Sequence, residues 1–255
     1  MKMERAHMKI DFYYWGNICP ITDEMIELFN KYNDNFFIEL HDISDNWDLA
    51  KNYEIYFPFL TIIDDTRRFY SPISDNFIQE LMSGKIPIEK PYLPKLGGNI
   101  YYGKIEPINK ENYELASLCT GRTKCKGCNS KIKMYQDNLE DIFGFVNIKD
   151  NELVGGAEFF PSIKVPYNIP KAKDIAFITC VYSSDEYFDY KTKPLEELEK
   201  YLSKKYTKVI VISDEKGVFP NGDLDFFKRN GYIDEKVIFE DAYCKLHLLW
   251  KKLVK

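Results

Sequence analysis

The sequence predicts an α/β protein made of two consecutive parts. Runs with the alternation of a strand and runs with the apolar face of a helix follow one another along the whole chain. The 255 residues, 45% of them apolar, exceed the roughly 150 residues of a usual domain. Residues 1–95 carry 10 basic and 16 acidic side chains, a balance of −6, whereas the rest carries 25 and 24, a balance of +1. Near this change, residues 91–98 (PYLPKLGG) predict a linker, so we expect domains at 8–90 and 99–255.

The composition argues against nucleic acid and membranes as partners of this protein. A net charge of −5 and a sequence pI of about 5.4 argue against nucleic acid as a partner. No apolar run approaches the roughly 20 residues that cross a bilayer, and the first residues lack a signal-peptide core, so no membrane partner is expected. Six cysteines in this length do not indicate a disulfide scaffold. We therefore expect a cytoplasmic protein with reduced thiols, and the oligomeric state is left open.

The first part predicts strands and helices in alternation. Aromatic and β-branched runs predict strands at 8–15, 36–41 and 59–63. Apolar residues at helical spacing predict a helix over 21–32 and a weaker one over 45–56. A last helix is expected to begin after Ser74, as N-cap, and to end at Gly84. A strand–helix–strand order predicts a parallel crossover.

The second part predicts a mixed sheet flanked by helices. Strands are expected at 100–108, 143–148, 153–160, 174–183, 208–213, 237–240 and 243–249. Helical patterns cover 111–119 and 131–140, and a further helix begins near Pro194. The helix over 223–230 is expected to end at Gly231. Asp150 and Asn151 predict a tight turn between two strands.

Residues 15–20 (WGNICP) lie where the first strand meets the first helix. They resemble the active-site turn of thioredoxin, with Gly16 in place of the first cysteine and Cys19 matching the second. Pro58, before the third strand, matches the family's cis-proline in context. The resemblance implies a thioredoxin-like domain over 8–90. One cysteine cannot cycle as an internal dithiol, so Cys19 is either a single functional thiol at a helix start or a small buried residue beside Pro58.

Two segments of the second part carry another resemblance. Residues 177–182 (FITCVY) form a strand that is followed by a loop and a proline-started helix, and residues 225–232 (DFFKRNGY) follow the strand 209–212 (VIVI). They are similar to strands four and five, with their helices, of the GNAT superfamily of N-acetyltransferases, nearest to its YoaP-like branch. The resemblance implies a GNAT-like domain over 99–255 that transfers an acetyl group from acetyl-CoA to an amine of a small molecule, peptide or protein.

The same resemblance implies where acetyl-CoA binds. The pantetheine would pair with the strand backbone, and the pyrophosphate would lie at the start of the next helix, a usual anion site. The loop 183–194 contains none of the family's glycines, and Lys191 and Lys193 are the cations that could replace them. The implied cofactor residues are Cys180, Val181, Tyr182, Lys191, Thr192 and Lys193.

Catalytic groups are assigned in the same way. Many family members have a tyrosine as general acid in the helix after strand five, where this chain has Phe226 and Phe227. Tyr182 and Tyr232 are the nearby candidates for that role. Glu158, on the expected third strand, is the candidate general base.

A cysteine cluster, Cys119-x5-Cys125-x2-Cys128, lies among five cations. Three thiols lack the fourth ligand of structural zinc unless Cys180 or Cys244 supplies it, so zinc is possible but not expected. Acetyl-CoA is the cofactor that the GNAT resemblance implies. The other readings are reactive thiols, a cationic acceptor pocket and idle cysteines. The alternatives to an acetyltransferase are thus a binding protein that has lost its chemistry and a thiol- or metal-handling protein. The cations are Arg122, Lys124, Lys126, Lys131 and Lys133.

Overall fold

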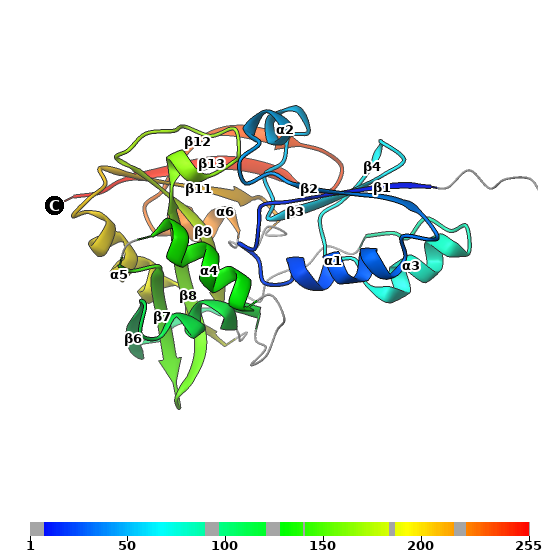
Figure 1. Cartoon of the computed structure of the whole chain (residues 1–255). Helices are drawn as coiled ribbons and strands as arrows, with labels where there is room; N and C mark the ends of the chain where they lie inside the picture. Colours follow the sequence, from blue (N-terminus) through cyan, green and yellow to red (C-terminus); the bar gives the residue numbers. More distant parts are fainter. Residues whose placement is uncertain are drawn as a thin grey trace, which may run out of the picture.

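A computed structural model describes residues 8–89, 97–120, 128–139, 141–183, 187–216 and 223–254 (Figure 1). It contains a four-stranded sheet, a seven-stranded sheet and a two-stranded sheet. We call residues 8–89 the N-terminal lobe and residues 97–254 the C-terminal lobe. The mixed α/β class is confirmed. Among the described residues, no helix has the length and apolar character needed to cross a bilayer.

The N-terminal lobe has strand order β2-β1-β3-β4. β1 runs parallel to β2, as the expected crossover requires, whereas β3 is antiparallel to β1, so the second strand–helix–strand unit is not a parallel crossover. Helices α1 and α3 cover one face of this sheet (Figure 1), where apolar residues from both helices and from β1 and β3 form a core. The elements are β1 (Lys9–Tyr14), α1 (Thr22–Lys31), β2 (Phe37–Asp42), α2 (Trp47–Asn52), β3 (Phe59–Ile63), β4 (Arg67–Phe69) and α3 (Asp75–Met82).

Local details of this lobe test several expectations. Ser74 caps α3, because its hydroxyl accepts the N–H of Phe77, and Gly84 follows the helix with a left-handed φ of 80°. Strand β4 was not expected, since its three residues include two arginines and are too short to show alternation. The described chain has no cis peptide bond, so the bond before Pro58 is trans, contrary to the expectation. The thioredoxin likeness of this lobe therefore stays a prediction.

The C-terminal lobe has strand order β12-β13-β11-β9-β8-β7-β6. β6 to β9 form an antiparallel meander, β9 and β11 are parallel, and β11, β13 and β12 are antiparallel. The elements are β5 (Asn99–Ile100), β6 (Lys104–Ile108), η1 (Tyr113–Thr120), α4 (Cys128–Asn138), β7 (Gly144–Lys149), β8 (Glu152–Pro161), η2 (Ser162–Lys164), β9 (Ile175–Ser183), β10 (Phe188–Asp189), α5 (Thr192–Leu202), β11 (Lys208–Asp214), α6 (Leu224–Arg229), β12 (Ile233–Glu240) and β13 (Lys245–Lys252).

The predicted strand at 100–108 is in fact two strands. β5 pairs with β10 in a separate small sheet, and β6 forms the edge of the large one. Gly103 lies between them, and a Cβ there would come within 2.3 Å of the Tyr101 ring, so the chain bends tightly at this point. The turn at Asp150 and Asn151 is confirmed, with φ values of 51° and 65°. Asp223 caps α6 and Gly231 follows it with a φ of 83°.

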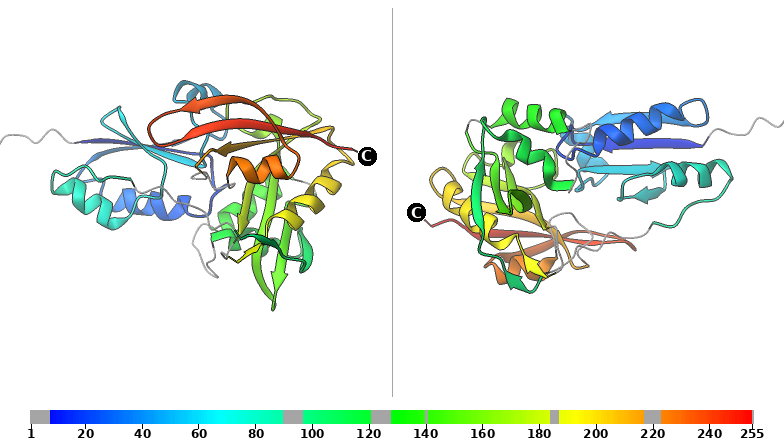
Figure 2. Two further views of the ribbon diagram at one scale, coloured as in Figure 1. Left: turned by 180° about the vertical axis from the view of Figure 1, so that it is seen from behind. Right: turned by 90° about the horizontal axis from the view of Figure 1, so that it is seen from below.

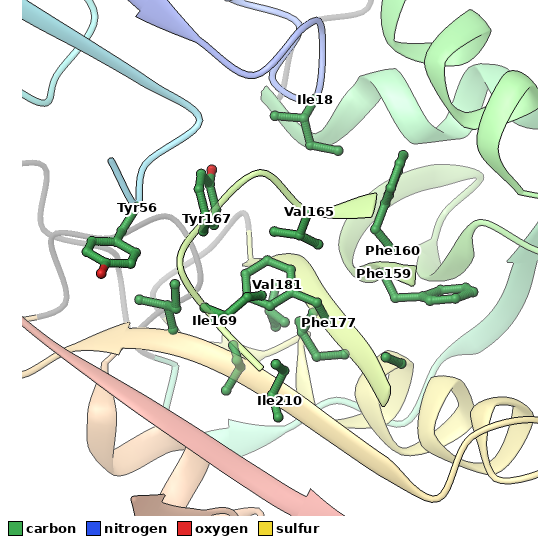
Figure 3. Packing of buried hydrophobic residues seen from close by; sticks show 14 of the residues in the cluster. Ile18, Tyr56, Phe159, Phe160, Val165, Tyr167, Ile169, Phe177, Val181 and Ile210 are labelled. Carbon is green, nitrogen blue, oxygen red and sulfur yellow. The ribbon is translucent and has the colours of Figure 1, made fainter. Parts of the chain in front are cut away.

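The two lobes share one hydrophobic core rather than meeting at a thin contact. Trp15 lies edge-on to Phe160 and Tyr167, with ring centroids 5.4 and 5.3 Å apart. Ile18 and Tyr56, also from the N-terminal lobe, reach the same group of side chains (Figure 3). One continuous cluster of buried residues therefore runs from β1 and β3 into the large sheet.

A second contact lies at the tip of the β12–β13 hairpin, which extends toward the N-terminal lobe (Figure 2). The Tyr70 hydroxyl donates to Asp241 at 2.6 Å, and the ring of Tyr70 stacks on that of Tyr243 at 5.1 Å. The lobes are thus joined at two separated places. The expected linker at residues 91–98 lies largely outside the described residues.

Candidate active site

The large sheet divides between β9 and β11. Within the described parts of these strands the parallel ladder has three pairs, from Ile175 with Lys208 to Phe177 with Ile210. β9 then continues to Ser183 and β11 to Asp214 without further pairing to each other. A gap between parallel strands at their carboxyl ends is where α/β sheets bind ligands.

Beside this division, β9 carries a bulge. The register between β8 and β9 shifts between the pairs Glu158–Cys180 and Phe159–Ile178, which leaves Thr179 as the extra residue. Bulges often re-aim side chains at active sites. Here Gly156, opposite Tyr182, has no Cβ, and a Cβ would come within 2.5 Å of the Tyr182 hydroxyl. The glycine thus allows the Tyr182 ring to lie across β8 and reach Glu158.

Glu158 is the centre of a buried polar group. It is fully buried and its carboxylate lies 2.7 Å from the ammonium of Lys131. The hydroxyls of Tyr135 and Tyr182 donate to its two oxygens at 2.5 and 3.2 Å. Thr179 lies 3.4 Å from the Tyr135 hydroxyl, so a chain of hydroxyls links the bulge to Glu158.

Helix α4 supplies two members of this group. Lys131 and Tyr135 are four residues apart and therefore lie on one helical face. Burial alone would lower the pKa of Lys131, but the adjacent Cys119 and Glu158 outweigh it and raise that pKa well above its usual value. Burial, and next the Glu158 charge, raise the pKa of the Tyr135 and Tyr182 hydroxyls well above 10.0. Both tyrosines therefore keep their protons and act as donors.

Three cysteines meet where the N-terminal lobe covers β9. Cys19 comes from the turn before α1, Cys119 from η1 and Cys180 from β9, and all three line one cavity of about 50 Å³. Pro58 and Trp15 close its side toward the N-terminal lobe. The Lys131 ammonium lies 3.4 Å from the Cys119 sulfur. The turn that resembles thioredoxin thus faces β9, one of the two strands between which the large sheet divides. Cys19 and Pro58 line the same cavity.

Gly16 explains the missing first cysteine of that turn. It has a φ of 43°, a region that side chains rarely adopt, and a Cβ would lie 3.0 Å from the Ser44 hydroxyl. A cysteine at this position would have a strained backbone, so the conformation of the turn favours glycine here and leaves Cys19 as its one thiol.

The start of α5, where the pyrophosphate was expected, is already capped by a carboxylate. Asp189 accepts the backbone N–H groups of Lys191 and Thr192 at 2.8 and 3.0 Å, and the Thr192 hydroxyl at 2.6 Å. These are the donors that a phosphate would use. The described part of this loop therefore does not fit a phosphate unless Asp189 withdraws.

The two predicted phosphate ligands also have other partners. The Lys191 ammonium is buried 4.2 Å from the centre of the Phe226 ring, and burial lowers its pKa. Lys193 pairs with Glu196 at 2.6 Å. The roles assigned to Lys191, Thr192 and Lys193 stay predictions, and the geometry does not favour them.

The two tyrosines that were candidates for the general acid lie in different places. Tyr182 is half-buried and contacts Glu158. Tyr232 is packed edge-on to Phe227, with the Lys251 ammonium 5.6 Å from its ring. Burial and the charge of Glu199 raise the pKa of Tyr232 well above its usual value. Of the three predicted catalytic residues, the structure brings Glu158 and Tyr182 together. Tyr232 instead contacts Phe227 and Lys251.

The predicted cysteine cluster is only partly described. Cys125 lies outside the described residues, as do Arg122, Lys124 and Lys126, and the side chain of Cys128 is not described. Cys119 lies with Cys180, one of the two expected partners, whereas Cys244 is buried elsewhere, at Asp241. Among the described side chains, the group with closely spaced ligand atoms is Asp11, Glu39 and His41, where Lys9 already pairs with Asp11 at 3.0 Å. The side chains that the structure describes give no support to a zinc site.

A larger cleft lies between the lobes. It has a volume of about 630 Å³, with Trp15, Trp47 and Phe160 among its walls and polar residues from α4 along one side. Trp15 lines both this cleft and the cysteine cavity. The cleft is large enough for a small-molecule acceptor.

Sequence reasoning missed three residues of the site. Lys131 is named above only as one of five cations near the cysteine cluster, but it is fully buried against Glu158, whereas Lys133 is exposed and pairs with Asp137 at 2.7 Å. The helical spacing of Lys131 and Tyr135 was the available signal for the pair. Nothing in the sequence distinguishes Asp189, the cap of α5, from the other acids of its loop.

In comparisons with known proteins, the chain matches solved structures only. No family model and no curated protein sequence matches the chain. Similar solved structures include an aminoglycoside 6'-N-acetyltransferase from Enterococcus faecium (12% identity, TM-score 0.42, 60% of this chain and 98% of that one). Another is an N-acetyltransferase from Staphylococcus aureus (13% identity, TM-score 0.44, 60% of this chain and 100% of that one). A third is a spermidine/spermine N-acetyltransferase from Vibrio cholerae (12% identity, TM-score 0.40, 59% of this chain and 92% of that one).

Proposed function

We propose that this protein is an acetyl-CoA-dependent N-acetyltransferase that acts on an amine of a small molecule or a protein. The observation that carries the proposal is the division of the sheet after three pairs between β9 and β11. Beyond these pairs, within the described strands, the backbone of β9 from Ile178 to Ser183 has no partner on β11, and a pantetheine arm could pair with it there. The succession of strands and helices along the C-terminal lobe agrees with the order of elements on which the GNAT resemblance depends.

The buried polar group supplies the proton transfers that such a reaction needs. The attacking amine loses a proton when its nitrogen forms a bond to the acetyl carbon and the carbon–sulfur bond breaks. The hydroxyls of Thr179 and Tyr135 lead from the cavity to Glu158, which can accept that proton. Tyr182, a donor to Glu158 at 3.2 Å, can protonate the departing thiolate and recover its proton from Glu158. The proton balance then closes within one group of residues.

Tyr182→Phe tests these roles. We expect kcat to fall by about 10²-fold, the scale of one general acid–base contribution, with an unchanged Kd for acetyl-CoA. Turnover would be measured as CoA release with spermidine and with an aminoglycoside as trial acceptors. Tyr187→Phe is the matched control, because Tyr187 is 71% exposed. Equal rates for the two variants would contradict the role of Tyr182.

Asp189 sets the affinity for acetyl-CoA if the pyrophosphate binds at α5. Asp189→Ala removes the carboxylate from two backbone N–H groups and one negative charge from the site. We expect titration calorimetry to show at least tenfold tighter binding of acetyl-CoA, together with a loss of about 1 kcal/mol of stability from the missing cap. Asp225→Ala, at the start of α6, is the control for a general charge effect. Weaker binding by Asp189→Ala would place the pyrophosphate elsewhere.

The capped start of α5 also favours a second candidate, a binding protein that keeps the fold without the reaction. Under this alternative, neither the natural chain nor Asp189→Ala binds acetyl-CoA at millimolar concentration. Micromolar binding by either protein, with CoA release in the presence of an amine, would instead support the transferase.

A further inference from the structure

The cleft between the lobes has the size and the walls of a small-molecule site. Its volume is about 630 Å³, and ligand pockets usually hold roughly 300–1,000 Å³. One wall is formed by the turn after β1 and by the start of α2, and the other by α4 and the end of β8. A ligand here would touch both lobes, and an aromatic or apolar body suits these walls. The apolar lining residues are Trp15, Trp47, Met134, Phe160 and Ile163.

Trp47 is a wall residue suited to contact a positive charge. It lines the cleft and is 46% exposed. The Lys171 ammonium already lies 4.6 Å from the centre of the Trp47 ring, so the ring contacts a cation within the protein itself. An ammonium within roughly 6 Å of an indole ring is attracted by the negative potential of its face. The exposed part of the ring is therefore a place for a second cation, supplied by a ligand.

The carboxylates on the side of the N-terminal lobe also favour a cation. Asp45 lines the cleft, and no described cationic side chain pairs with it. Two more acids lie directly behind lining residues. Asp23 accepts the hydroxyl of Ser130 at 2.8 Å. Asp42 accepts the hydroxyl of Ser44 at 2.6 Å, and within the described part of the chain neither of these two acids forms an ion pair.

The cations of the cleft belong to the other lobe and already have partners. Lys133 pairs with Asp137 at 2.7 Å, within α4. The Lys164 ammonium donates to the carbonyl of Asn138 at 3.0 Å. Among the described residues that line the cleft or lie directly behind its lining, four carboxylates therefore stand against two ammoniums. The excess of negative charge lies on the side of Asp45.

We propose that this cleft binds an organic cation, in which an ammonium group is attached to an aromatic or branched apolar body. The ammonium contacts Trp47 and Asp45, and the body packs along Met134 and Ile163, which are half-buried. Negative charge and an aromatic face together favour such a ligand over a carboxylate or a phosphate. Its identification as the acetyl acceptor rests on the proposed function, whereas the binding site does not.

Benzyltrimethylammonium tests the site, because it carries a permanent charge and has no N–H to acetylate. 3-Phenylpropionate is the matched anion, with a similar aromatic body. Binding to the full chain would be measured by titration calorimetry in the absence of acetyl-CoA. We expect a submillimolar Kd for the cation, at least tenfold weaker binding of the anion, and weaker binding of the cation as salt is raised. Equal affinity for the two, or no binding of the cation at millimolar concentration, would overturn the proposal.

Variants locate the cation in the cleft. Asp45→Asn removes an exposed charge, so folding is unaffected, and we expect Kd to rise about fivefold. Trp47→Ala is expected to raise Kd at least fivefold, and Lys164→Gln, which removes a positive charge from the cleft, to lower it. Asp48→Asn, in the first turn of the same helix α2 but outside the lining, is the matched control and leaves Kd unchanged. Unchanged affinity in both Asp45→Asn and Trp47→Ala would place the cation elsewhere and overturn the proposal.

The same probe separates this proposal from the proposed function. With phenethylamine as a trial acceptor, competitive inhibition of CoA release by benzyltrimethylammonium would make the cleft the acceptor site. Binding of benzyltrimethylammonium without CoA release from any trial amine would contradict the transferase and support the cation site. CoA release from phenethylamine without binding of benzyltrimethylammonium would support the transferase and contradict the cation site.

Discussion

Glu158→Ala is expected to destabilise the protein by about 3–5 kcal/mol, the usual cost of leaving one partner of a buried ion pair alone. The side chain of Lys131 is 1% exposed, so its ammonium would have no access to water once the carboxylate is removed. Tyr135 and Tyr182 would lose the same acceptor. Because whole domains are stable by only about 5–15 kcal/mol, urea unfolding should show a large fall in midpoint.

A double-mutant cycle distinguishes the pair from mere packing. Glu158→Gln and Lys131→Met each leave one buried charge, whereas the double variant leaves none. We expect the double variant to be more stable than the sum of the two single effects predicts, with a coupling of about 2–3 kcal/mol. Additive losses would show that the ion pair contributes nothing beyond its volume. Lys133→Met is the control on the same helix, because the Lys133–Asp137 pair is exposed.

The cycle also bears on function. In Glu158→Gln the single amide oxygen can still accept from one of the two tyrosine hydroxyls, which donate to different carboxylate oxygens, but the side chain cannot take up a proton. A variant that folds and binds acetyl-CoA but has lost turnover would place Glu158 on the proton path. A folded variant with full turnover would restrict Glu158 to holding Lys131 and the two tyrosines in position.

The sequence predicts the strands and helices well, because their signals are local. The buried-strand run at residues 59–63, the Ser74 cap and the turn at Asp150 and Asn151 all depend on neighbouring residues, and the structure confirms them. β4 and the break at Gly103 were missed, since a three-residue strand and a close approach to Tyr101 leave little pattern.

The site was less predictable, because it depends on long-range pairing. Glu158 is predicted from its place on a strand, but its partner Lys131 is predicted only as one of five cations near the cysteine cluster. The charge of a lysine gives no sign of burial when its counterion is 27 residues away. Cys19 and Cys180 likewise meet only because the N-terminal lobe packs on β9. That packing depends on aromatic contacts that local periodicity does not reveal.

Trp15→Ala is expected to cost about 3–5 kcal/mol, the range for deleting a large buried aromatic side chain. Its ring is 2% exposed and touches Phe160 and Tyr167 across the lobe interface. Trp47→Ala is the matched control, since Trp47 lines the same cleft but is 46% exposed, and it should cost about 1 kcal/mol from the lost Lys171 contact. Unfolding would be followed by far-UV circular dichroism, which does not depend on either tryptophan.

The shape of the transition tells more than its midpoint. If the shared core couples the lobes, the natural chain unfolds in one step, and Trp15→Ala both lowers the midpoint and separates the two lobes into two steps. Because Trp15 lines both the cleft and the cysteine cavity, its removal is expected to open the cavity further, and the thiols of Cys19 and Cys180 should react faster with a thiol reagent. Equal costs for Trp15→Ala and Trp47→Ala, with unchanged thiol reactivity, would mean that the lobes do not depend on this ring for their packing.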